Sequence, residues 1–150
     1  MQSALVITRN VRIQFGFALG AAIPIVGVGT AIAMGKLRLH EGRTDIAQFL
    51  IIPFFDMVAI SVPFGLSMHW RKKPELHRRL ILIATCSLTA AAFGRFPSTL
   101  MPHHWFYAGV DFLLLLGVLR DLVVTKRVHP VYVYALPLLA LGQTAIIHAL

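Results

Sequence analysis

Residues 47–68 read AQFLIIPFFDMVAISVPFGLSM, an apolar stretch interrupted by a single charged residue, Asp56. A helix that spans a membrane needs about 20 mostly apolar residues, and this stretch supplies them. Over the 150 residues of the chain, 57% are hydrophobic and 13% are charged. Soluble domains average about 45–50% and 25% respectively. The stretch and the composition together predict an integral membrane protein.

Four further stretches have the same character, which predicts a single all-α domain, residues 1–150, built as a bundle of five transmembrane helices. The expected spans are Ile13–Met34, Ala47–Met68, Arg79–Phe96, Trp105–Val124 and Pro130–Ala149. Helices are favoured because in lipid each spanning segment must satisfy its own backbone hydrogen bonds, and open strands cannot. The third span is rich in small residues, which favours a central place in the bundle.

Basic residues are divided unequally between the two sides that five spans define. On one side lie the N-terminus and the loops after the second and fourth spans. That side holds ten of the 14 lysines and arginines: Arg9, Arg12, Arg71, Lys72, Lys73, Arg78, Arg79, Arg120, Lys126 and Arg127. Cytoplasmic segments carry such an excess. We therefore expect a bacterial inner-membrane protein with a cytoplasmic N-terminus and an external C-terminus. Because the net charge of +8 belongs to these loops, it does not indicate nucleic-acid binding.

Asp56 and Asp111 lie within otherwise apolar spans, where an ionised side chain costs roughly 2.5–3.5 kcal/mol on insertion scales. The predicted topology places both, together with Arg95, in the outer half of the membrane. We expect Arg95 to pair with the aspartates, near Tyr107 and His104, which share a helical face with Asp111. Such a network either holds three helices in register or forms a ligand or proton site open to the outer face. In a third alternative Arg95 reaches the lipid headgroups and at least one aspartate stays protonated.

Seven histidines raise the question of a haem b, which axial histidines hold in many membrane proteins. All seven lie near helix ends. The pairs that could serve are His69 with His129 and His104 with His148, the last lying one turn after Thr144. We expect no cofactor and no metal site, because the sequence has no HExxH pattern and no ligand cluster, and its motifs favour a non-enzymatic protein.

The segment 69–79, HWRKKPELHRR, is expected to form a cytoplasmic hairpin between the second and third spans. Pro74 and Glu75 suit the first turn of a helix. The hairpin's cations are expected to contact lipid phosphates or a partner protein. They are Arg71, Lys72, Lys73, Arg78 and Arg79.

Residues 74–85, PELHRRLILIAT, resemble the P-E-x-H-R-R-L-x-L-x-A-T stretch of bacterial multi-span membrane proteins similar to the YozB-like families of unknown function. The likeness includes IPFFDM at 52–57 and GRFP at 94–97, and it covers roughly residues 47–130. It implies an inner-membrane helical bundle and no particular activity. A neighbouring family with a similar H-R-R-L segment is linked to cytochrome oxidase assembly. Longer relatives begin with histidine-bearing helices, whereas VRIQFG at 11–16 holds no histidine, which argues against an inherited haem.

These features lead us to expect an accessory or assembly subunit of a larger respiratory or photosynthetic membrane complex, or a small-ligand binder. The lipid bilayer and other membrane subunits are the expected partners. The alternative is a b-haem or quinone-linked electron-transfer protein. Gly16 and Gly20, one turn apart in the first span, would let a second helix approach closely, either within the chain or in a dimer.

Overall fold

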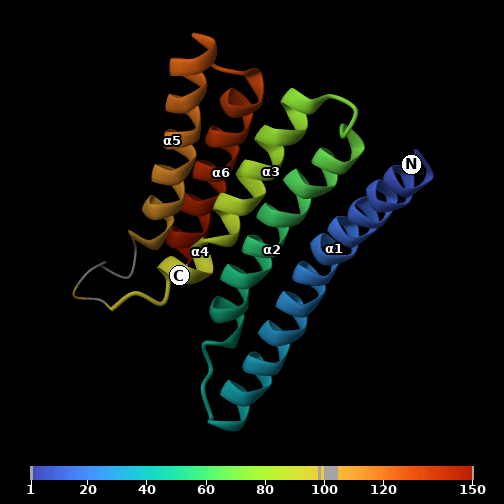
Figure 1. The fold of residues 1–150 in the computed structure, drawn as a ribbon. Coiled ribbons are helices and arrows are strands. Elements are labelled where there is room, and N and C mark those ends of the chain that lie inside the picture. Colours follow the sequence, from blue (N-terminus) through green and yellow to red (C-terminus); the bar gives the residue numbers. More distant parts are fainter. Residues whose placement is uncertain (1, 98, 100–104, 150) are drawn as a thin grey trace.

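Helices joined by short connections, with no strand, make up the residues that the computed structural model describes, namely 2–97, 99 and 105–149, with the side chains of 2–10, 12, 13 and 149 excepted. The helices are α1 (Gln2–His40), α2 (Ile46–His69), α3 (Pro74–Leu88), α4 (Ala90–Phe93), α5 (Phe106–Thr125) and α6 (Pro130–Ala149). They lie side by side in one elongated bundle, with the N-terminal end of α1 at one edge of it (Figure 1).

Four helical stretches within the described residues are long and apolar enough to cross a membrane. They are Gln14–His40, Ile46–His69, Pro74–Phe93 and Pro130–His148. The 20-residue helix α5 has the length of a span but carries Asp111, Arg120 and Asp121, which lower its hydropathy. The predicted all-helical membrane bundle is thereby confirmed.

α3 lies at the centre of the bundle, between α2 on one side and α5 and α6 on the other (Figure 1). Of the residues in its apolar window, 39% are buried inside the bundle, against 6–11% for the three other apolar spans. The buried core draws on five helices, α2 to α6, and consists of Ala59, Ile83, Cys86, Ala90, Tyr107, Val110, Leu114, Tyr132 and Leu139. The central position predicted from the small residues of this span is confirmed, since small side chains let neighbouring helices pack on several sides.

The third predicted span differs from the structure at both ends. It begins at Pro74 rather than Arg79, because proline at the first helical position loses no hydrogen bond. It is interrupted at Thr89, whose Oγ1 donates to the Cys86 carbonyl at 2.6 Å. This side-chain bond competes with the regular backbone pattern. The short helix α4 resumes at Ala90 and ends at Phe93.

Small residues on α1 face α2 and allow a close approach. A Cβ atom at Gly20 would overlap the ring of Phe64, and one at Gly27 would overlap the side chain of Met57. Gly16, the other glycine of the predicted GxxxG pair, would have nothing within 4 Å of its Cβ. The two helices diverge toward the N-terminal end of α1 (Figure 1). Only one glycine of the pair therefore packs within the chain.

Candidate functional site

Asp56 of α2 and Tyr107 of α5 meet in the core, where they are 8% and 3% exposed. The Tyr107 hydroxyl donates to Asp56 Oδ1 at 3.0 Å. The ring of Phe55 packs edge-on against Tyr107, with 6.2 Å between centroids. The structure thus brings together two of the residues that the sequence grouped. The bond joins α2 to α5 across the core, where a donor offsets part of the cost of burying a carboxyl group.

Asp111, half-buried on α5, faces Gln143 of α6. With its amide nitrogen toward α5, Gln143 donates to both carboxylate oxygens of Asp111 at 3.2 Å. Gln143 is buried, whereas its neighbours on α6, Thr144 and His148, are exposed. Its spacing shows why: it lies one turn after the buried Leu139, on the face that α6 turns to the core.

The predicted ion pairs of Arg95 with Asp56 and Asp111 are wrong. None of the ion pairs among the described residues joins them, and Arg95 is exposed. α4 ends at Phe93, so Arg95 lies in the turn beyond it rather than within the bundle. Each aspartate instead has an uncharged donor. His104, the remaining member of the predicted network, lies outside the described residues.

The polar centre at Asp56 has almost no free space. A cavity of about 10 Å³ lies between Asp56, Tyr107, Ser87 and Gln143. A cavity needs about 10–15 Å³ to hold one water molecule. Among the described residues this centre therefore has no room for an organic ligand, which favours the structural role over the ligand site.

A second buried centre joins α3 to α5. Arg79, 8% exposed, donates from Nε to Asp121 Oδ2 at 2.5 Å, and Asp121 is 7% exposed. Arg79 Nη1 also donates to Glu75 Oε2 at 2.7 Å and to the Glu75 carbonyl at 2.9 Å. Because a buried arginine stays protonated, such partners are needed to offset the cost of removing its charge from water. These bonds form a clamp of Arg79, Asp121 and Glu75.

The lipid or partner contact predicted for Arg79 is thus wrong, because the early start of α3 places this residue inside the bundle. The sequence analysis also missed Asp121. A signal was present: Tyr107, Leu114 and Asp121 recur every seven residues, and all three are buried, as one helical face requires. The other hairpin cations, Arg71, Lys72, Lys73 and Arg78, are exposed as expected.

The described histidines have separate local surroundings. His69 is exposed and packs edge-on against Trp70, with 5.7 Å between ring centroids. His129 Nδ1 accepts a hydrogen bond from the Val131 N–H at 3.3 Å, and thus serves the first turn of α6. His77 Nδ1 lies 2.9 Å from the carbonyl of Ser67. The part of the chain that the structure describes contains no group of three or more potential metal ligands.

Comparison of the chain with protein-family models, with curated proteins and with solved structures gives no match. The fold and the buried centres define the class as a helical protein with several potential membrane crossings. Its buried acidic side chains are hydrogen-bonded to side chains on neighbouring helices of the same chain.

Proposed function

We propose that the protein is a non-enzymatic accessory or assembly subunit of a larger respiratory or photosynthetic complex in a bacterial inner membrane. The observation that carries the proposal is the outer face of α1, the face turned away from α2. This face combines exposure, small side chains and the absence of a second supporting helix among the described residues.

The outer face of α1 carries small residues at regular helical spacing. They are Ala18, Ala22, Gly29 and Ala33, which fall on one side because they are separated by four, seven and four residues. All four are exposed, and a Cβ at Gly29 would meet nothing within 4 Å. Lipid tails cover any apolar side chain, whereas small residues at this spacing let a second helix backbone approach.

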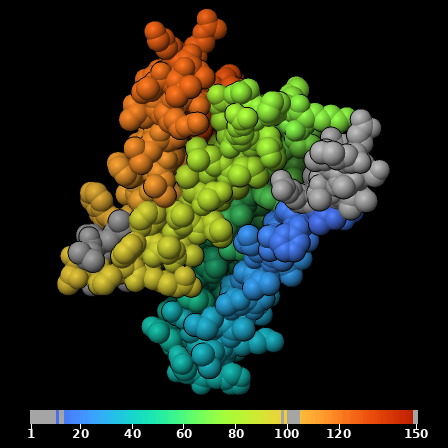
Figure 2. All heavy atoms as spheres, in the orientation of Figure 1, coloured from blue at the N-terminus to red at the C-terminus, as the bar shows by residue number. Residues whose placement is uncertain are grey.

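α1 is also the least supported long helix of the bundle. It packs substantially on α2 alone, whereas α2, α3, α5 and α6 each pack on two or more helices. In the space-filling view α1 lies at the edge of the molecule (Figure 2). A transmembrane helix of a partner subunit against the outer face would give α1 the second neighbour that the other long helices have.

The polar centres support a non-enzymatic role. Asp56, Asp111 and Arg79 are each hydrogen-bonded to a neighbouring helix. These bonds hold neighbouring helices together. The cavity beside Asp56 is too small for a substrate. An active site would instead direct a reactive group into an accessible space.

The orientation belongs to the same proposal. The basic residues favour a cytoplasmic N-terminus. That places the α2–α3 and α5–α6 connections on the cytoplasmic side and the α1–α2 connection outside.

The proposal is tested by gentle-detergent purification of the tagged chain followed by mass spectrometry. We expect the same membrane subunits to co-purify in fixed stoichiometry, and Ile25→Trp on α1 to reduce their amount. Leu141→Trp on α6 is the matched control, since both positions are 70% exposed. A chain that purifies alone, or equal losses in both variants, contradicts the proposal. An absorption spectrum of the same sample decides the haem alternative, which predicts a stoichiometric b-type Soret band.

A further inference from the structure

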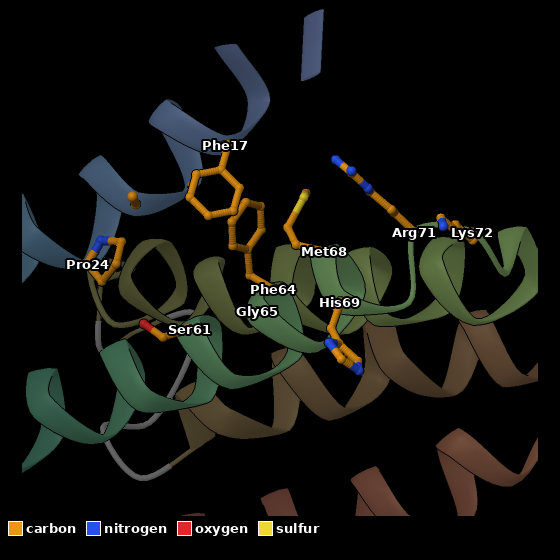
Figure 3. Close-up of a pocket in the computed structure, with 11 residues that line it drawn as sticks. Phe17, Pro24, Ser61, Phe64, Gly65, Met68, His69, Arg71 and Lys72 are labelled. Carbon is orange, nitrogen blue, oxygen red and sulfur yellow. The ribbon is translucent and has the colours of Figure 1, made fainter. Parts of the chain in front are cut away.

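A cleft of about 750 Å³ opens where α1 diverges from α2. Its walls are mostly apolar and include Phe17 and Pro24 of α1 and Phe64 and Met68 of α2. Phe17 and Phe64 lie close together between the two helices (Figure 3). The volume lies within the range of about 300–1,000 Å³ that is typical of small-ligand sites. The cleft is thus large enough for an extended apolar chain.

One end of the cleft is cationic. Arg71 and Lys72 belong to its lining and follow the last turn of α2, which ends at His69. Arg71 extends from this end toward α1 (Figure 3). Both residues are exposed, and neither takes part in an ion pair among the described residues. Their charges are therefore free to meet an anion at the mouth of the cleft, unlike that of Arg79.

We propose that this cleft binds one anionic phospholipid, with an acyl chain against Phe17, Phe64 and Met68 and the phosphate at Arg71 and Lys72. The apolar walls select a molecule with a hydrocarbon chain, and the two cations select a negative headgroup. Lysine and arginine close to a membrane surface attract anionic lipids in this way. A free phosphate would use the cations alone and leave the apolar walls uncovered. The inference goes beyond the accessory role, since it concerns a ligand of the isolated chain.

The charge requirement is tested by native mass spectrometry of the purified chain, titrated with phosphatidylglycerol or with phosphatidylcholine of the same acyl chains. We expect tighter binding of phosphatidylglycerol. The variant Arg71→Gln/Lys72→Gln should weaken that binding by roughly five-fold per cation removed, and should leave phosphatidylcholine binding unchanged. The control Arg120→Gln/Arg127→Gln removes the same charge from exposed positions outside the cleft, and should retain the preference.

The shape requirement is tested by filling the cleft. Gly65 lines it, and a Cβ there would meet nothing within 4 Å, so Gly65→Phe places a ring in open space. We expect this variant to lose at least tenfold in phosphatidylglycerol affinity. Ala140→Phe, at an exposed small residue of α6 outside the cleft, should bind like the unmodified chain.

Three results would overturn the proposal. The first is equal affinity for the two lipids. The second is an equal loss in the test and control variants of either pair. The third is displacement of phosphatidylglycerol by millimolar inorganic phosphate, which would mean that the cations bind phosphate without the cleft. Because every titration uses the isolated chain, these outcomes do not depend on whether a partner subunit exists.

Discussion

Arg79 is the charged residue on which the packing of α3 against α5 depends most. Arg79→Ala should lower the free energy of unfolding by about 3–5 kcal/mol, because it leaves the buried Asp121 without its partner. Replacing both, as Arg79→Met/Asp121→Leu, should restore most of that loss, since a packed apolar pair needs no desolvation. Unfolding followed by circular dichroism in mixed micelles measures both.

The control for this prediction is Arg95→Ala. Arg95 is exposed, and surface substitutions usually stay within about 0.5 kcal/mol. Equal losses at Arg79 and Arg95 would contradict the assignment of the buried clamp and would favour the Arg95 network expected from the sequence.

The hydrogen bond from the Tyr107 hydroxyl to Asp56 is a second polar contact that joins two helices. Tyr107→Phe removes the donor to Asp56 and should cost about 1–3 kcal/mol, the usual cost of a buried polar group left without its hydrogen bond. The same change at Tyr134, which is 77% exposed, should have little effect. A Tyr107 variant as stable as the Tyr134 variant would show that the bond does not contribute. The unfolding assay used for Arg79 measures this difference.

Some of these contacts could be predicted from the sequence and others could not. Asp56 and Tyr107 were grouped correctly because chain direction and helical rise fix the depth of a residue in a span. Gln143 and Asp121 were missed because depth does not tell which face of a helix is turned inward. That choice depends on the packing of α5 and α6, which the weak apolar asymmetry of these helices does not specify.

At the scale of the helices, glycines set how closely neighbours approach. A Cβ at Gly142 of α6 would lie 2.6 Å from the ring of Phe55, so Gly142→Ala should force α6 away from α2 and cost about 1–3 kcal/mol. Gly29→Ala meets open space and should stabilise α1 by up to about 1 kcal/mol through helix propensity. Thermal unfolding of the two variants checks the sign of each change, and a shared sign would contradict this account.

The positions of most helices follow closely from the sequence, because a single apolar segment in lipid satisfies its backbone hydrogen bonds by forming a helix. α2 and α6 lie within one residue of their predicted bounds. α1 departs most, because it runs from Gln2 to His40 against the predicted Ile13–Met34. α3 also departs at both ends, since Pro74 permits an earlier start and Thr89 diverts a hydrogen bond from the helix. Both causes are local side-chain effects that hydropathy does not register.

At the scale of the whole molecule, the odd number of long helices and the distribution of basic residues make one prediction about orientation. A reporter that is active only outside the cytoplasm should be active when fused after Leu150 and inactive when inserted in the α2–α3 connection after Lys72. The reverse pattern would contradict the proposed orientation. Activity at both sites would contradict the number of crossings.

The central claim is that a partner helix covers the outer face of α1. It is tested most directly by site-specific photocrosslinking in intact membranes, with a photoreactive residue at Ala22 or Ala33 on α1 and at Leu138 on α6 as the control. Leu138 is 71% exposed and is expected to face lipid. The account predicts discrete crosslinked protein products of the same mass from Ala22 and Ala33, and lipid adducts alone from Leu138. Lipid adducts alone from all three positions would contradict it.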